Sequence, residues 1–145
     1  MDVIFDIDGT LADITHRRHF VATKPKNWTA FQAGANLDKC VEPLAVVARN
    51  LKNKGLHRII LCSGRGEQER PVTEAWLDKH QIPYDHLYMR TEKDYRADDI
   101  IKEELLDRMI ADGYRPELVF DDRDRVVKMW RRRKIVCAQV AEGDF

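Results

Sequence analysis

Apolar and polar positions follow two different periods along the chain. Short apolar runs predict strands near residues 2–6, 57–62, 86–89, 117–121 and 135–140. Between them, apolar residues recur three and four positions apart, which predicts helices over 43–54, 70–79, 96–112 and 124–133. Gly55 and Gly113 directly follow two of these helical patterns and favour helix ends there. Alternating strands and helices are typical of an α/β fold with a central parallel sheet of about five strands and helices on both faces.

The least regular stretch lies between the first strand and the first long helix, over residues 13–40. A segment of this length without strong periodicity is typical of a cover over an active site. The chain shows no repeat, low-complexity tract or linker. We therefore expect one domain over residues 1–145, with 13–40 as an irregular, cap-like insert of small size.

Composition limits the partners and the cellular compartment of the protein and does not identify its function. Lys plus Arg and Asp plus Glu each total 25 of 145 residues, so any polyanion would have to bind a local basic patch. No eighteen-residue apolar run and no signal-peptide pattern occurs, which predicts a cytoplasmic protein without a membrane partner. Cys40, Cys62 and Cys137 have no metal-like spacing, and we expect them to be reduced.

The first strand ends in Asp6-Ile7-Asp8-Gly9-Thr10. Residues i and i+2 of a strand share a face, so Asp6 and Asp8 can point at one spot beyond the strand end. Gly9 permits a sharp turn and close approach of a ligand, and Thr10 adds a hydroxyl. An ordinary turn explains the isolated motif equally well, because Asp and Gly are common turn residues.

Two other predicted strands also end in polar motifs, where ligands bind in open parallel sheets. Ser63-Gly64-Arg65-Gly66 offers a hydroxyl, flexible backbone and a guanidinium, which suit a phosphate. The adjacent carboxylates of Asp121 and Asp122 need neutralisation, and a hard cation such as Mg²⁺ would supply it. The alternative for the Ser63–Gly66 motif is a glycine turn with a surface arginine. The alternative for Asp121 or Asp122 is the N-cap of the following helix.

Asp98 and Lys102 are four residues apart and can pair on one helix face. A pair of this kind is usually only a solvated surface pair. Its position here, between the Ser63-Gly64-Arg65 and Asp121-Asp122 motifs, favours a role in the same site.

This order of motifs resembles the haloacid dehalogenase (HAD) superfamily of phosphatases, which have a Rossmann-like fold. More closely, it resembles the 3′-phosphatase domain of phage polynucleotide kinase/phosphatase. The most specific part of that resemblance is the ending, with Val127-Lys128-Met129-Trp130-Arg131-Arg132 and Gln139-Val140-Ala141-Glu142-Gly143-Asp144-Phe145. The resemblance covers nearly the whole chain, although residues 19–35 form a longer segment than in that domain.

The resemblance implies a role for each motif residue. Asp6 would be the nucleophile, and Asp8 a protonated acid/base. Asp98 would orient Lys102. Mg²⁺ would be bound by Asp6, the Asp8 main-chain carbonyl and the Asp121/Asp122 pair. The remaining phosphate- or substrate-binding residues would be Thr10, Arg17, Ser63, Gly64, Arg65 and Lys102.

The resulting hypothesis is a Mg²⁺-dependent phosphomonoesterase that forms an aspartyl-phosphate and acts on 3′-phosphorylated nucleic-acid ends or nucleotides. Arg18, Arg123 and Arg125 could contact phosphates, and Trp28 could stack on a base. Phosphatases for 5′-nucleotides or other small esters, and a non-catalytic phosphate or nucleic-acid binding module, remain alternatives. No G-x-x-x-x-G-K-[ST] motif occurs, so a kinase or ligase would be a separate partner. A phage-encoded chain would act in the host cytoplasm.

Overall fold

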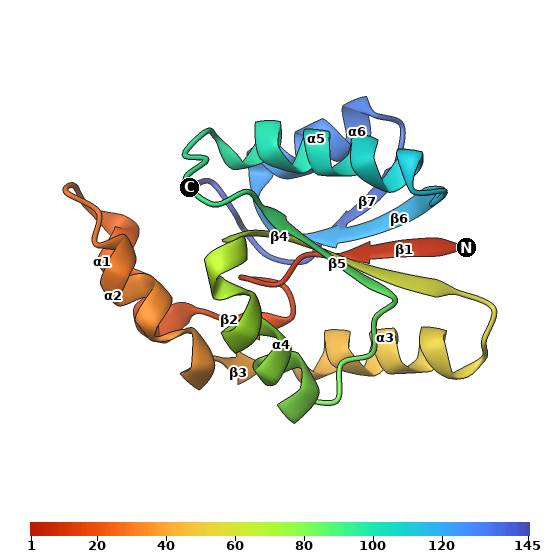
Figure 1. Cartoon of the computed structure of the whole chain (residues 1–145), viewed down its shortest axis with the longest axis horizontal. Coiled ribbons are helices and arrows are strands. Elements are labelled where there is room, and N and C mark those ends of the chain that lie inside the picture. The colour runs from red at the N-terminus through yellow and green to blue at the C-terminus, as the bar shows by residue number, and fades with distance from the viewer.

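The computed structural model describes residues 1–145 and places a five-stranded parallel sheet between two helical layers (Figure 1). The strands lie in the order β5-β4-β1-β6-β7, so the amino-terminal strand is central. Their bounds are β1 (Asp2–Phe5), β4 (Arg58–Gly66), β5 (His86–Arg90), β6 (Pro116–Asp121) and β7 (Val136–Gln139). The helices around the sheet are α3 (Glu42–Asn53), α4 (Arg70–Lys79), α5 (Asp98–Ala111) and α6 (Asp124–Arg132). The predicted α/β class is confirmed.

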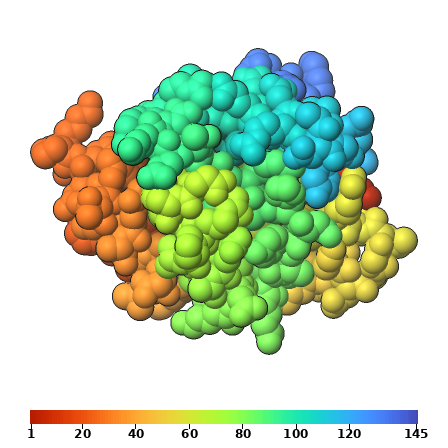
Figure 2. All heavy atoms as spheres, in the orientation of Figure 1, coloured from red at the N-terminus to blue at the C-terminus, as the bar shows by residue number.

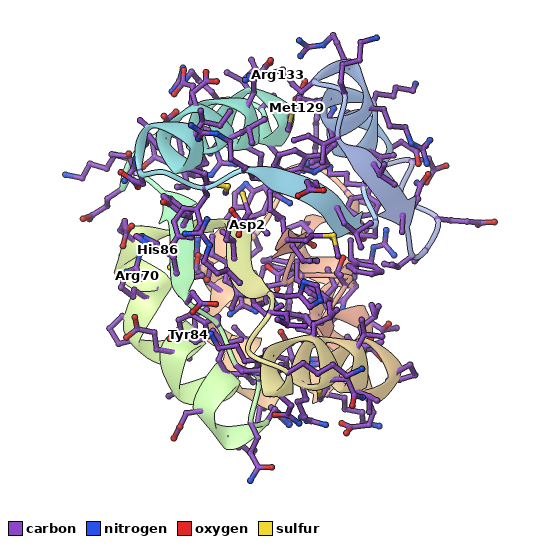
Figure 3. The ribbon with its side chains drawn as sticks, turned by 90° about the vertical axis from the view of Figure 1, so that its right-hand side faces the viewer. Asp2, Arg70, Tyr84, His86, Met129 and Arg133 are labelled. Carbon is purple, nitrogen blue, oxygen red and sulfur yellow. The ribbon has the colours of Figure 1, made fainter.

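The alternation of strand side chains builds a core on each face of the sheet. Ile4 and Val119 belong to the cluster under α5 and α6, whereas Val3 and Phe5 belong to the cluster under α3 and α4. Figure 3 shows the layers from the amino-terminal end of β1, with the labelled Met129 in the α5–α6 layer. These two clusters fix the ends of the strands relative to one another.

Residues 12–40 form a small segment beyond the carboxyl ends of the sheet strands, which we call the cap (Figures 1 and 2). A two-stranded antiparallel ribbon, β2 (Ala12–Asp13) with β3 (Lys39–Cys40), ties both ends of the cap together. Between them lie α1 (His19–Ala22), α2 (Trp28–Ala33) and two 3₁₀ turns at Thr15–Arg17 and Ala35–Leu37. The sequence pattern indicated irregular structure here because helices of four and six residues are too short to show periodicity.

The structure shifts several predicted boundaries. β4 continues to Gly66, four residues past its predicted end, because Ser63 and Gly66 still pair with β5. α5 begins at Asp98 and not at Arg96. Gly55 and Gly113 follow α3 and α5 with φ of +65° and +97°, as the helix-end prediction requires.

The predictions on membrane spans and on the cysteines can be compared with the structure. None of the helices combines the length and apolarity that a membrane span requires. All three cysteines are free, and Cys62 and Cys137 are buried in the core. The division of the chain into one domain with a cap-like insert stays a prediction.

Candidate active site

The polar residues at the strand ends meet at one edge of the sheet. The Asp6 amide donates to the Phe120 carbonyl at 2.9 Å, which holds Asp6 in line with the neighbouring strand β6. Gly9 turns the chain immediately afterwards with φ of +86°. A Cβ at Gly9 would collide with the Asp122 carboxylate, so the β1 and β6 loops approach closely only because residue 9 is glycine.

Asp6, Asp121 and Asp122 form a buried acidic cluster whose carboxylate oxygens lie within 4.8 Å of one another. Lys102 enters this cluster from α5, and its Nζ donates to Asp6 Oδ1 at 2.7 Å and to Asp121 Oδ2 at 2.9 Å. One ammonium faces three carboxylates, so the cluster has an excess of negative charge. We refer to these four residues as the acidic cluster.

The oxygens of the acidic cluster differ in how they are satisfied. Asp121 Oδ2 also accepts from Trp130 Nε1 at 3.1 Å, and Asp121 Oδ1 accepts from the Asp122 amide at 2.9 Å. By contrast, Asp6 Oδ2 is buried without any hydrogen-bond partner. An unpartnered buried carboxylate oxygen is costly, and Asp6 Oδ2 is therefore a free donor atom for a cation.

The pKa values of the acidic cluster follow from burial and from repulsion between carboxylates. Burial raises the pKa of Asp6 well above its usual value, and Asp121 and Asp122 raise it further against the opposing effect of Lys102. Burial, with the neighbouring Asp121, raises the pKa of Asp122 to about 6. A divalent cation would offset both the burial of these carboxylates and the repulsion between them. A set of oxygen donors suits Mg²⁺. The residues therefore fit the predicted metal.

A second group, which we call the arginine cluster, lies beside the first. Arg17 Nη2 donates to Asp8 Oδ1 at 2.8 Å and to Asp38 Oδ2 at 2.6 Å. Arg65 Nη2 donates to the same two atoms at 2.6 Å and 3.2 Å. Two guanidiniums thus face two carboxylates, and the charges balance.

The arginine cluster favours the ionised form of Asp8 in the substrate-free protein, whereas the predicted acid/base role needs a proton on Asp8 during the reaction. Burial raises the pKa of Asp8, but the ion pairs with Arg65 and Arg17 outweigh burial and leave the pKa below its usual value. Asp8 is therefore ionised in the substrate-free protein. The sequence suggested an acid from the family role alone and could not show which cations lie next to it.

Asp38 is the functional candidate that the sequence analysis missed. Its side chain is fully buried, and it accepts from Arg17, Arg65 and, at 2.8 Å, from His16 Nε2. Its main-chain carbonyl accepts from Trp76 Nε1 at 2.8 Å, which anchors the cap to α4. No motif surrounds Asp38, so a single sequence carried no signal for it.

Three predicted phosphate-binding side chains lie behind the cleft wall. Thr10, Arg17 and Ser63 are almost completely buried and do not line the cleft. Ser63 Oγ accepts from the Arg65 amide at 3.1 Å and so supports the loop that carries Arg65. The Thr10 hydroxyl has no partner.

Gly64 and Asp98 lie together, as a Cβ at Gly64 would collide with the Asp98 carboxylate. Asp98 Oδ2 is 3.8 Å from Lys102 Nζ, an ion pair too long for a hydrogen bond. Asp98 also pairs with Arg90 at 3.3 Å. Lys102 is therefore aimed mainly by Asp6 and Asp121, and Asp98 contributes less to its orientation than the spacing suggested.

Both clusters open into one cleft of about 830 Å³. Its floor includes Asp6, Asp8, Arg65 and Lys102. The cap forms one wall and the loop between β5 and α5 forms another, so a ligand that enters between them reaches both clusters.

Comparison with known proteins agrees with this arrangement. Residues 1–145 match the family described as the polynucleotide kinase PNKP phosphatase domain. A protein of Autographa californica nuclear polyhedrosis virus, described as a bifunctional polynucleotide kinase/RNA ligase, is 32% identical over 136 residues, which are 92% of this chain and 18% of that protein.

Solved structures also include a similar chain from a nucleic-acid repair complex. A chain in the Pnkp1/Rnl/Hen1 RNA repair complex is 41% identical, with a TM-score of 0.84, and the match covers 99% of this chain and 43% of that chain. A phosphatase structure from Clostridium difficile shares the fold with a TM-score of 0.69 at 14% identity, covering 99% of this chain and 87% of that one. The chain spans about a fifth of its viral relative and less than half of the repair-complex chain.

The match over the full chain includes every motif at the strand ends. The structure brings Asp6, Lys102 and the Asp121/Asp122 pair together at one edge of a Rossmann-like sheet. The chain is a HAD-type phosphatase that belongs to the family of polynucleotide kinase PNKP phosphatase domains.

Proposed function

We propose that the protein removes 3′ phosphates from nucleic-acid ends or nucleotides through a covalent aspartyl-phosphate on Asp6, with Mg²⁺ as cofactor. One observation carries this proposal: Asp6 is buried, Lys102 binds one of its oxygens, and the other oxygen has no partner at the floor of an open cleft. The family and the description of the viral relative support the substrate class.

In the first step, the Asp6 carboxylate attacks phosphorus, forms the acyl-phosphate bond and breaks the bond to the leaving oxygen. Lys102 and Arg65 line the cleft and can bind the non-bridging oxygens, together with the main chain at Gly64. Ser63, Thr10 and Arg17 lie behind these groups on the buried side, and Ser63 supports the loop that carries Arg65.

Asp8 acquires its proton as a consequence of substrate binding in this proposal. A phosphate in the cleft offers Arg65 new anionic acceptors, and an Arg65 that turns from Asp8 to phosphate removes the larger of the two ion pairs that hold the pKa of Asp8 low. Asp8 then takes a proton from solvent and donates it to the leaving oxygen. In the second step a water molecule attacks phosphorus, the bond between phosphorus and Asp6 breaks, inorganic phosphate leaves, and Asp8 accepts the proton of the water. Asp38 holds both guanidiniums in place meanwhile.

The Asp6, Asp121 and Asp122 carboxylates are the side-chain groups that would hold Mg²⁺, with the Asp8 main-chain carbonyl assigned by family resemblance. When bound, the ion offsets repulsion between an anionic nucleophile and an anionic phosphate. Asp121 also accepts a hydrogen bond from Lys102 Nζ and so orients this lysine.

The test is release of phosphate from equal concentrations of 3′-phosphorylated oligonucleotides, 5′-phosphorylated oligonucleotides and mononucleotides. We expect the 3′-phosphorylated ends to be fastest, no activity after chelation with EDTA, and recovery with Mg²⁺. Faster cleavage of 5′ ends or of small esters would favour the second candidate function. Binding without turnover of any ester would favour the non-catalytic module.

A kinase or a ligase is the expected partner, and we place the activity in the cytoplasm. One relative is described as a kinase/ligase, and another matched chain belongs to an RNA repair complex. A 3′-phosphorylated strand incubated with this enzyme should become a substrate for a ligase that requires a 3′ hydroxyl. If the treated strand stayed unligatable, the repair role would be wrong.

A further inference from the structure

Residues 139–145, which we call the 139–145 segment, run along the loop that carries Asp122. In Figure 1 this end of the chain lies on the side where the sheet strands end. β7 is an edge strand of the sheet, and its last residue, Gln139, is paired in register with Asp121. The segment therefore leaves the sheet next to the acidic cluster.

Main-chain hydrogen bonds join this segment to the chain on both sides of Asp122. The Val140 amide donates to the Asp121 carbonyl at 3.1 Å, and the Asp124 amide donates to the Gly143 carbonyl at 2.8 Å. The segment and the loop between β6 and α6 are thus fixed to each other through main-chain atoms.

The Gln139 side chain adds a further link to the same loop. Its Nε2 donates to the Asp122 carbonyl at 3.0 Å and to Asp124 Oδ1 at 2.6 Å. A side-chain amide nitrogen carries two hydrogens, so Gln139 can make both bonds at once. This side chain therefore connects the end of β7 to the main chain of Asp122 and to the start of α6.

The carboxylates of the acidic cluster differ in what holds them. Those of Asp6 and Asp121 accept from Lys102, whereas the Asp122 carboxylate accepts no hydrogen bond from another residue. The direction of the Asp122 side chain therefore depends on the position of its own main chain, which the 139–145 segment contacts.

Gly143 allows the segment and the loop to approach closely. A Cβ at this position would collide with the main-chain oxygen of Asp122 and with Cα of Arg123. Because the colliding atoms belong to the main chain, no side-chain rotation could relieve the overlap. Gly143 is buried and its φ lies outside the left-handed region, so the close approach and not the backbone conformation requires glycine here.

We propose that Gln139 and Gly143 are positioning residues for Asp122, and that the 139–145 segment holds this carboxylate in the direction that Mg²⁺ binding needs. The inference rests on the proposed binding of Mg²⁺ in the acidic cluster. Groups that orient a metal ligand without touching the metal typically contribute about 10–100-fold to metal affinity. Neither residue lines the cleft, so we expect no direct effect on ester binding.

The test is the dissociation constant of Mg²⁺, obtained from the rise of Tm with Mg²⁺ concentration, which does not depend on turnover. Gln139→Ala and Gln139→Met remove the donor, and Gly143→Ala introduces the collision. Each should raise the dissociation constant about tenfold. Gln139→Met keeps the length of the side chain, so a wild-type value in this variant would show that the hydrogen bonds of Gln139 do not position Asp122.

The kinetic readout separates positioning from general damage to the site. At saturating Mg²⁺, kcat of the Gln139 variants on a 3′-phosphorylated oligonucleotide should return to within about twofold of the wild-type value, with KM for the oligonucleotide unchanged. The Mg²⁺ concentration that gives half of the maximal rate should rise in parallel with the dissociation constant. A loss of kcat that Mg²⁺ does not restore would contradict a positioning role.

Two control variants lie away from the loop. Asn50 on α3 also donates its side-chain amide to a main-chain carbonyl, that of Val46 at 2.9 Å, so Asn50→Ala should leave the Mg²⁺ dissociation constant unchanged. Gly55 has φ of +65° and open space around its Cβ position, so Gly55→Ala should lower Tm through backbone strain alone. An unchanged Mg²⁺ dissociation constant in Gly55→Ala would show that lower stability does not by itself weaken metal binding.

The possible failures are distinguishable. Wild-type Mg²⁺ affinity in folded Gln139→Ala and Gln139→Met would overturn the positioning role and leave the proposed function intact. If Gly143→Ala does not fold, the two Gln139 variants still decide the question. If Mg²⁺ does not raise the Tm of the wild-type protein at any concentration, the proposed metal site is wrong, and the inference falls with it.

Discussion

The acidic cluster and the arginine cluster lie side by side but balance their charges differently. The acidic cluster has three carboxylates against Lys102 and leaves Asp6 Oδ2 without a partner. The arginine cluster pairs two guanidiniums with Asp8 and Asp38, and every member has a partner within 3.2 Å. The first cluster therefore needs a cation from outside, whereas the second is complete until a phosphate competes for its donors.

This difference indicates which cluster a bound ligand can stabilise. A buried charge without compensation is costly, so a ligand that supplies the compensation gains stability for the complex and the fold together. The arginine cluster is already balanced, so an added ion would not stabilise it. Its contribution is to hold its side chains in a fixed geometry. Five experiments test this division, and they run from the largest expected effect to the smallest.

Replacement of the nucleophile should have the largest effect. Asp6→Asn should lower kcat by about 10⁴-fold or more, because an amide cannot form the aspartyl-phosphate. Its carbonyl can still accept from Lys102, and one negative charge of an overcrowded cluster is removed, so thermal stability should not fall. Phosphate release and thermal unfolding of the same preparation measure both effects. Normal turnover would refute the nucleophile assignment.

Removal of the buried anchor should be the most destabilising change in the arginine cluster. Asp38→Ala leaves Arg17 and Arg65 with an uncompensated buried charge, and should lower the free energy of unfolding by about 3–5 kcal/mol. Denaturant unfolding measures this loss. Asp13→Ala, at an exposed carboxylate of the same segment, is the matched control. Equal stability of the two variants would show that the network is not structural.

Mg²⁺ should stabilise the acidic cluster specifically. At a concentration of 100 times its dissociation constant, the ion should raise the free energy of unfolding by about 2.7 kcal/mol. Asp122→Asn should abolish the rise in Tm, while Asp8→Asn should keep most of it because the Asp8 carboxylate lies outside the cluster. A full Mg²⁺ shift in Asp122→Asn would remove that residue from the metal site.

The same cluster predicts a pH dependence without metal. The pKa of Asp122 is about 6 in the folded protein, above the value near 3.8 expected when unfolded. The folded state therefore binds more protons between these values, and this group lowers the free energy of unfolding as pH rises from about 4 to about 6. Thermal unfolding in EDTA at pH 5 and pH 7 measures the change, and Asp122→Asn should reduce it. An unchanged pH profile in that variant would assign the dependence to other groups.

Asp98→Asn should have the smallest effect of the five. Lys102 keeps its two short hydrogen bonds to Asp6 and Asp121, and loses only the 3.8 Å ion pair. We expect kcat to fall by about tenfold or less, with Asp121→Asn more severe in the same assay. The reverse order would make Asp98 the principal orienting residue, as the sequence spacing alone suggested.

Sequence patterning predicted the sheet and its four flanking helices because burial imposes clear periods on long elements. The motifs at the ends of β1, β4 and β6 were predictable because parallel strands end at one edge. Asp38 was not, since its role depends on the path of the cap between α2 and α3, which no local pattern encodes. The ionised state of Asp8 was missed for a related reason: its pKa is set by Arg17 and Arg65 from distant parts of the chain.

β1 is the central strand, and the Asp6 amide is bonded to β6 immediately beyond it. In the cap, by contrast, Arg17 and Asp38 are anchored to the body, but the short helices α1 and α2 contain no buried residue. Local unfolding should therefore occur in the cap first, and amide hydrogen exchange there should be fast while that of Asp6 approaches the global limit. A nucleic-acid substrate would then enter and leave when the cap opens transiently, and the nucleophile Asp6 would stay in place.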